Sequence, residues 1–333
     1  MSLLSPSDDA AAAITQLRTW LETDDPQHLV IETSGSSGRP KRVVLSRDAV
    51  VASVEASARR LGERGQWLLA VPSSYVAGVQ VIARSLLAGH DPRVVADLDF
   101  TGATEGRFTS LVPTQLHRLL EDGSQVEALR RLHTILLGGG PLDPGLRRRA
   151  EDAGLRIVAT YGASETAGGC VYDGEPLDGV TLDLAEDGRI RIGGPTIFEG
   201  YDDDPALTAI TLVDGRFWTS DAGRIDDDGR LHVLGRIDDV VISGGVKVPL
   251  PAVAARIREH PDVHAVEVLG VPDDEWGARV VAFVVPTLSR KKLRNWVAEE
   301  LPRTWAPQQV VAVETLPLLP NGKVDRQALA GLV

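Results

Sequence analysis

Residues 33–41 decide the interpretation of this chain, and they read Thr33-Ser34-Gly35-Ser36-Ser37-Gly38-Arg39-Pro40-Lys41. Glycines let backbone N–H groups approach anionic oxygens, hydroxyls add hydrogen-bond donors, and the final lysine adds a positive charge. The common NTPase loop is different, because it has four residues between its glycines and a Lys-Ser or Lys-Thr pair that opens a helix. The stretch indicates a loop that binds phosphate groups, and a flexible hairpin tip is the alternative.

The segments on either side of this loop predict how it is held. Residues 28–31 and 42–45 have the pattern of strands, so the loop is expected at the tip of a β-hairpin. Ser46 is a predicted N-cap for a helix that runs to about Leu61. Further strands are predicted at 67–71, 92–95, 108–112, 134–137 and 156–160, with helices at 76–88, before Gly123 and at 143–153. This alternation predicts an α/β layer with a largely parallel sheet.

The pattern changes after Tyr172. Residues 179–235 predict a β-rich subdomain whose turns contain Asp187-Gly188, Asp214-Gly215 and Asp228-Gly229. The last section predicts a small α+β domain, with strands at 240–242, 265–269, 280–285 and 309–313 and helices at 250–259 and 291–301. We therefore expect a large N-terminal domain at 1–235 and a small C-terminal domain at 236–333.

Composition excludes several classes of protein. A chain of 333 residues is long enough for two domains. Its net charge of −12 argues against a nucleic-acid-binding surface, which needs clustered Lys and Arg. No run of apolar residues is long enough to predict a membrane span, and the N-terminus does not read as a secretion signal, so a cytoplasmic location is expected. A single cysteine, Cys170, excludes an internal disulfide framework and a multi-cysteine metal site.

Four further motifs follow the loop, and together they carry a family resemblance. In chain order they are Tyr161-Gly162-Ala163-Ser164-Glu165-Thr166; Phe217-Trp218-Thr219-Ser220-Asp221; Gly235-Arg236-Ile237-Asp238-Asp239 with Ile242-Ser243-Gly244-Gly245; and Pro320-Asn321-Gly322-Lys323-Val324. With residues 33–41 they resemble the motifs of the adenylate-forming superfamily of acyl-CoA synthetases, luciferases and adenylation domains. Ser164 stands where that family usually has threonine. The order of the five matches, over nearly the whole chain, makes the resemblance specific.

The resemblance implies ATP, Mg²⁺ and coenzyme A as the partners of a carboxylic acid. It implies that residues 33–41, including Lys41, hold the β- and γ-phosphates, and that Glu165 helps to bind Mg²⁺. Asp221 is implied to hold the ribose, Arg236 the ribose or phosphates, and Asp238 to be the hinge. Lys323 is implied to bridge the carboxylate and the α-phosphate when its domain swings in. The remaining residues with an implied nucleotide contact are Gly139, Gly140, Tyr161, Gly162 and Ser164.

Each of these residues also has a simpler interpretation. Glu165 would otherwise be a surface carboxylate after a strand, Asp221 a turn aspartate and Arg236 half of a surface ion pair. Lys323, in an Asn-Gly turn, would be a solvated lysine. The glycines at 138–140 would form a plain turn between a strand and a helix.

A segment at 72–89 bears on which acid is used. It contains Tyr75, Gly78 and Arg84, and it resembles the acid-binding segment of the o-succinylbenzoate–CoA ligases of menaquinone synthesis, with Tyr75 in place of a histidine. Arg84 is a candidate partner for the second carboxylate of a dicarboxylic acid, with a helix-surface charge as the alternative. The chain has less sequence before its phosphate loop than most relatives, so a trimmed N-terminal domain or a homodimer is expected. Another aromatic or short acid, loading of a carrier protein, and a non-catalytic nucleotide-binding module remain as alternatives.

Overall fold

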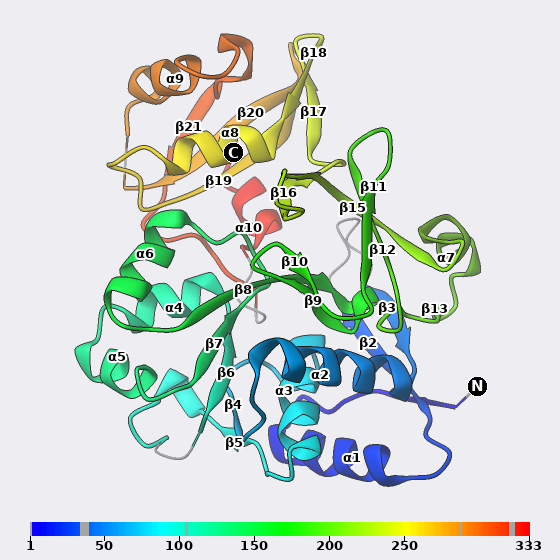
Figure 1. Ribbon diagram of the computed structural model, residues 1–333. Coiled ribbons are helices and arrows are strands. Elements are labelled where there is room, and N and C mark those ends of the chain that lie inside the picture. The colour runs from blue at the N-terminus through cyan, green and yellow to red at the C-terminus, as the bar shows by residue number, and fades with distance from the viewer. Residues whose placement is uncertain (1, 34–39, 104–105, 287, 320–323) are drawn as a thin grey trace. The chain divides into compact units, whose positions relative to one another are not determined.

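The computed structural model describes residues 2–33, 40–103, 106–286, 288–319 and 324–333. The chain divides into two compact units (Figure 1). The larger unit comprises residues 1–185, 190–219 and 225–231, and the smaller unit comprises 186–189, 220–224 and 232–333. The expected domain boundary at Arg236 stays a prediction. Among the described residues, no helix combines the length and apolar character needed to cross a membrane.

A seven-stranded sheet forms the centre of the larger unit, in the order β10-β9-β8-β7-β6-β4-β5. In that order the bounds are Glu175–Pro176, Gly168–Tyr172, Ile157–Ala163, Thr134–Leu137, Phe108–Leu111, Trp67–Leu69 and Arg93–Val94. The pairs from β8 to β5 are parallel, and β9 and β10 are antiparallel additions. The prediction of a largely parallel sheet is therefore confirmed.

Helices cover both faces of this sheet, so the larger unit is layered (Figure 1). One face packs against α2 (Arg47–Leu61) and α3 (Val76–Leu87), with α1 (Ala10–Glu22) outside α3. The other face packs against α4 (Pro113–Leu119), α5 (Gly123–Leu129) and α6 (Pro144–Asp152). A short helix, η1, covers Ala96–Leu98. Strand residues alternate between the two apolar clusters, as the period of two along a strand requires.

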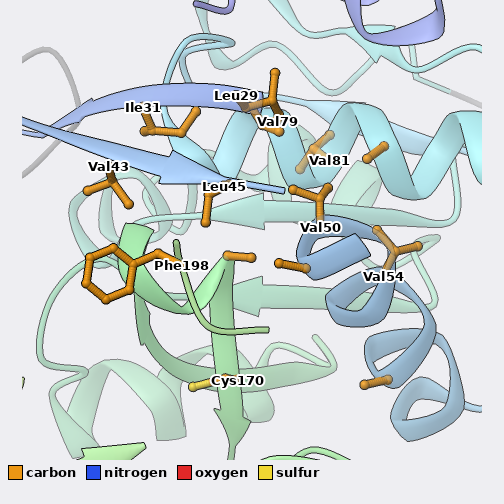
Figure 2. Close-up of a cluster of buried hydrophobic side chains, with 14 of the residues drawn as sticks. Leu29, Ile31, Val43, Leu45, Val50, Val54, Val79, Val81, Cys170 and Phe198 are labelled. Carbon is orange, nitrogen blue, oxygen red and sulfur yellow. The ribbon is translucent and has the colours of Figure 1, made fainter. Parts of the chain in front are cut away.

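A second sheet carries the hairpin predicted from the sequence. Its order is β1-β2-β3-β13, with bounds Leu3–Leu4, His28–Thr33, Lys41–Leu45 and Gly200–Tyr201. Figure 2 shows its Leu29, Ile31 and Leu45 beside Val50 of α2 and Val79 of α3. The side chain of Ser46 accepts a hydrogen bond from Ala49 N, which confirms it as the N-cap of α2.

A third sheet forms the β-rich part predicted at 179–235. Its order is β11-β12-β15-β14, with β16 paired to β15, and the bounds are Thr181–Leu184, Arg189–Gly193, Arg216–Ile225, Leu212–Val213 and Leu231–Arg236. Gly188, Gly215 and Gly229 all have positive φ, so the three predicted turns are confirmed. The sequence did not predict α7 (Pro205–Thr211), which begins after the N-cap Asp204.

The smaller unit contains a fourth sheet, ordered β18-β17-β20-β19 with β21 beside β20. Its strands are Val246–Pro249, Val240–Ser243, Gly277–Val285, Ala265–Asp273 and Gln309–Ala312, and its helices are α8 (Leu250–Arg258), α9 (Arg290–Ala298), η3 (Arg303–Trp305) and α10 (Arg326–Ala330). Most of these elements match the predicted ones. The sequence-based predictions did not include α1, α5, α10 or β18. The helices α5 and α10 are short and β18 is an edge strand, so their periodic signals are weak. Helix α1 was missed despite its 13 residues and the helical spacing of its buried Ala13, Leu17 and Trp20.

Gly78 lies inside α3 and has a packing role. A Cβ atom there would lie closer than 3.0 Å to the backbone of Pro72 and Ser73, which cannot move aside as a flexible side chain could. Gly123, the first residue of α5, offers a contrast, because a Cβ atom there would meet nothing within 4 Å.

We predict that Gly78→Ala destabilises the fold by about 1–3 kcal/mol, because the added methyl overpacks the start of α3. Alanine is otherwise the better helix former, so the ordinary effect would have the opposite sign. Gly123→Ala is the matched control and should change stability by less than about 0.5 kcal/mol. Urea unfolding followed by circular dichroism measures both, and a Gly78→Ala protein at least as stable as the parent would contradict the packing argument.

Candidate active site

The carboxyl ends of the parallel strands converge where β8 meets β9. The register between these strands shifts between Tyr161 and Gly162, which is a bulge of the kind that redirects side chains. A Cβ atom on Gly162 would lie closer than 3.0 Å to Gly168 O, so only glycine fits there. On the neighbouring strand end, Gly139 has φ +80°, and a Cβ on Gly140 would meet nothing within 4 Å. The structure thus brings the predicted Tyr161–Gly162 and Gly139–Gly140 segments to adjacent strand ends.

Glu165 follows directly, in the short helix η2 (Ser164–Thr166), and is held at two points. Ser164 and Glu165 are both buried, which excludes a solvated surface carboxylate. The backbone oxygen of Glu165 accepts from Phe198 N at 3.0 Å, and its Oε1 accepts from the hydroxyl of Tyr201 at 2.7 Å. The carboxylate is therefore fixed in orientation by residues from a distant part of the chain.

Tyr201 connects this carboxylate to the end of the phosphate loop. Strand β13 pairs with β3 so that Tyr201 lies opposite Val43, two residues from Lys41 on the same face. Lys41 Nζ lies 5.4 Å from the centre of the Tyr201 ring, which is a cation–π distance. Burial, followed by the charge of Glu165, raises the pKa of Tyr201, so its hydroxyl stays protonated and donates.

Only part of the predicted phosphate loop lies within the described residues. Thr33 and Lys41 are paired across β2 and β3, so both ends of the loop are placed as the hairpin prediction requires. Ser34, Gly35, Ser36, Ser37 and Gly38 lie outside the described residues, as does Lys323.

The cluster of Lys41, Tyr201 and Glu165 fits the Mg²⁺ that the resemblance implies. Mg²⁺ is usually held by one or two carboxylates together with substrate phosphates, rather than by a cage of side chains. Within the described part of the chain, no group of three His, Cys, Asp or Glu side chains is placed to hold a metal ion. The Glu165 carboxylate, which shares its contact with Tyr201 with Lys41, would suit a metal ion that binds together with a nucleotide.

The smaller unit holds the other predicted nucleotide contacts. Arg236, at the end of β16, donates from Nε to Asp238 Oδ1 at 2.7 Å and pairs with the same carboxylate through Nη2. These bonds, followed by the negative charges of Asp238, Asp221 and Asp239, raise the pKa of Arg236. The structure therefore brings Asp221, Arg236 and Asp238 together, and the expected ribose contact of Arg236 stays a prediction.

Arg84 lies in the interior of the larger unit. Its side chain is 6% exposed, so the structure excludes a helix-surface charge. Its guanidinium carbon lies 4.9 Å from the centre of the Trp67 ring, and Nη2 donates to the hydroxyl of Tyr172 at 3.1 Å. Nε is buried without a hydrogen-bond partner, and no ion pair among the described residues includes Arg84. Burial lowers the pKa of Arg84, because removing the guanidinium from water disfavours its charged form.

The other candidate residues of this segment lie nearer the start of α3. Tyr75 precedes the helix at its N-cap position and is partly exposed, and Gly78 packs against the backbone described above. Gln80 lies one turn before Arg84 on the same helix face, is 2% exposed, and neither of its amide atoms has a partner among the described residues. Whether Tyr75, Gly78 or Arg84 touches a substrate stays a prediction.

Sequence reasoning missed Gln80 and Tyr201. The single amide within the apolar run 76–83 was a visible signal for a buried polar group at Gln80. Tyr201 gave no comparable signal, because its importance comes from a strand pairing that joins residues about 160 positions apart.

Comparisons with known proteins agree with this geometry. Residues 6–202 match the AMP-binding enzyme family, and residues 252–323 match the AMP-binding enzyme C-terminal domain. The chain is 41% identical to the probable 2-succinylbenzoate–CoA ligase of Mycobacterium tuberculosis, over 98% of this chain and 92% of that protein. It is 33% identical to the 2-succinylbenzoate–CoA ligase of Listeria monocytogenes, over 90% of this chain and 69% of that protein.

Solved structures give the same result. The o-succinylbenzoate CoA synthetase of Bacillus subtilis, in complex with the acyl-adenylate intermediate, is 26% identical, with a TM-score of 0.77 over 90% of this chain and 68% of that chain. The same synthetase has been solved with ATP and a magnesium ion, with a TM-score of 0.76 and 25% identity over 90% of this chain and 69% of that chain. By sequence, by fold and by the position of its motifs, the chain belongs to the AMP-binding family of adenylate-forming enzymes.

Proposed function

We propose that this protein is an AMP-forming o-succinylbenzoate–CoA ligase. In the first half-reaction a carboxylate oxygen of the acid attacks the α-phosphorus of ATP, and the bond to pyrophosphate breaks. In the second, the sulfur of coenzyme A attacks the acyl carbon of the adenylate, and AMP leaves with the oxygen that bridged the two groups. The mycobacterial, Listeria and Bacillus relatives support this assignment through their names.

The cluster around Glu165 suits the first half-reaction. Negative charge grows on the phosphoryl oxygens and on the departing pyrophosphate, and preorganised cations and N–H groups stabilise such charge. Lys41 lies at the end of the proposed phosphate loop, and Glu165, oriented by Tyr201, would hold Mg²⁺. When bound, Mg²⁺ neutralises part of the phosphate charge. The hydrogen bond from Tyr201 fixes the orientation of the Glu165 carboxylate, so the carboxylate would already be oriented before the nucleotide binds.

The names of the relatives carry the choice of acid, and Arg84 is the residue proposed to meet its second carboxylate. A buried guanidinium without a carboxylate partner is costly, and a dicarboxylic acid could supply the missing charge. Tyr172 and Trp67 would hold the guanidinium in place for that contact. The proposed contact would favour a substrate with a second carboxylate, although Trp67 begins β4 and therefore lies at the amino end of the parallel strands.

The rest of the proposal concerns the C-terminal domain, the location and assembly of the protein, and the thiol acceptor. Lys323 would serve the first half-reaction, and rotation of the C-terminal domain about Asp238 would replace it with the thiol of coenzyme A. A cytoplasmic location and a homodimer remain expectations from the sequence. A carrier-protein thiol in place of coenzyme A is the alternative acceptor.

A panel of acids tests the proposed function. We expect pyrophosphate release that depends on ATP, Mg²⁺ and o-succinylbenzoate, and formation of a thioester only when coenzyme A is added. Simple benzoates and fatty acids should be poor substrates. If no acid supports pyrophosphate release, the chain is a nucleotide-binding module, whereas a thioester formed only on a carrier protein would favour the alternative acceptor.

Lys323→Ala should separate the two half-reactions. We expect acid-dependent pyrophosphate release to fall by at least ~100-fold, because one cation directed at the developing charge is removed. Thioester formation from chemically prepared o-succinylbenzoyl-adenylate should keep most of its rate. Equal losses in both assays, with the variant folded, would contradict the role assigned to this lysine.

Arg84→Ala should damage the use of a second carboxylate. A charge-assisted pair in a partly dry pocket corresponds to roughly 30- to 1,000-fold in kcat/KM. We therefore expect that loss for o-succinylbenzoate and a much smaller one for 4-oxo-4-phenylbutanoate or 2-butyrylbenzoate, each of which lacks one carboxylate. The mono-acid that the parent enzyme accepts provides the comparison. Equal losses on both acids would show that Arg84 is structural.

A further inference from the structure

Two adjacent aspartates at the start of the small domain have different partners. Asp238 pairs with Arg236, which precedes it in the chain. Asp239 instead accepts from Nη1 of Arg326 with both carboxylate oxygens, at 2.8 Å each. The backbone of Asp239 is also held within the small domain, because its oxygen accepts from Leu250 N, at the start of α8, at 3.0 Å. The side chain and carbonyl of Asp239 therefore contact elements later in the chain, while its N–H donates to Arg236 O at 3.3 Å.

Arg326 uses a different edge of its guanidinium for each of its contacts. While Nη1 binds Asp239, Nε lies 3.2 Å from Glu267 Oε1 on β19, and Nη2 is directed at Val268 O at 3.4 Å. The side chains of Asp239 and Glu267 are only 22% and 20% exposed. Burial raises the pKa of Glu267, and the positive charges of Arg326 and Arg258 oppose that rise. A lysine could not reproduce this set of contacts, because its ammonium is a single point of charge.

Arg326 also lies three residues after Lys323 in the sequence. The described residues on both sides of 320–323 are joined, since Leu318 pairs with Val324 in an antiparallel bridge and Asp325 N donates to Pro317 O at 2.8 Å. Val324, Leu316 and Leu329 pack with Phe283 in one small apolar cluster. Arg326 is the charged connection between this segment and the first residue after the proposed hinge.

We propose that Arg326 is a positioning residue for adenylation. It connects residues 316–319 and 324–329, which lie on either side of Lys323 in the sequence, to Asp239, so that these residues and Asp239 move as one body with the small domain. The proposal rests on the function proposed above for Lys323 and Asp238. It places the pivot before Asp239 and the rigid body after it. Without the Arg326 contacts, rotation at the hinge would no longer deliver the segment to a fixed place.

Arg326→Met tests the proposal, because it removes the charge and keeps most of the apolar stem. We expect pyrophosphate release to fall by about 10- to 100-fold, as a small misplacement of a catalytic group does. Thioester formation from prepared acyl-adenylate should change by less than about threefold, because that step does not use Lys323. Hydrogen exchange should increase in peptides that cover 314–333 and remain unchanged in β20.

Three other variants keep the test decisive. Arg279→Met is the matched control, because it removes a similarly exposed guanidinium from the same unit, where Arg279 pairs with Asp273. It should leave both half-reactions at parent rates. Asp239→Asn removes the negative charge and one of the two acceptor oxygens while keeping the side-chain shape, and should lower pyrophosphate release in the same direction as Arg326→Met. Arg326→Lys should recover only part of the loss.

The outcomes distinguish the positioning role of Arg326 from the proposed role of Lys323. An inactive Lys323→Ala with a fully active Arg326→Met would overturn the positioning role and leave the proposed function standing. An active Lys323→Ala would overturn the proposed role of the lysine itself. Equal losses in both half-reactions for Arg326→Met, with a large fall in unfolding temperature, would make Arg326 a purely structural residue.

Discussion

The site depends on the pairing of strand β3 with a neighbour on each side. Pairing with β2 joins the ends of the proposed phosphate loop, and pairing with β13 brings Tyr201 beside Lys41. Tyr201 in turn holds Glu165, which projects from the region where the parallel sheet ends. A slip of one residue in either pairing would turn the side chains to the opposite face. Register in a small four-stranded sheet therefore sets where Lys41 and Glu165, the residues proposed to act on the phosphates, lie relative to Tyr201.

Two arginines show how differently a cation can be used in this chain. Arg84 is buried in the larger unit against a ring and a hydroxyl and has no carboxylate partner within the described residues. Arg326 is partly exposed in the smaller unit and contacts two carboxylates. Completed ion-pair networks hold segments together, whereas an incomplete one costs stability and can persist where a ligand completes it. The first arrangement suits recognition of an anion, and the second suits mechanical coupling.

The sequence predicted the largely parallel sheet and the hairpin, because each of these leaves a local pattern of apolar residues, glycines and helix caps. The roles of Glu165 and Asp221 come only from the family resemblance, since a single carboxylate has no local signature, and both roles stay predictions. The sequence could not predict Tyr201 or the Arg326–Asp239 contact, because both join segments far apart in the chain. Nor could it decide whether Arg84 was exposed, since a lone arginine in an apolar helix fits either environment. The positions of Ser34 to Gly38 and of Lys323 stay predictions.

The central claim is that a carboxylate oxygen of the acid attacks the α-phosphate of ATP. The most direct measurement uses o-succinylbenzoate labelled with ¹⁸O in its carboxylates, together with unlabelled ATP, Mg²⁺ and coenzyme A in ordinary water. Mass spectrometry of the nucleotide product should find AMP that carries one ¹⁸O atom, because the bridging oxygen of the adenylate stays with phosphorus when the thiol attacks the acyl carbon. Unlabelled AMP, or ADP with the label in inorganic phosphate, would contradict an acyl-adenylate and with it the assigned chemistry of the site.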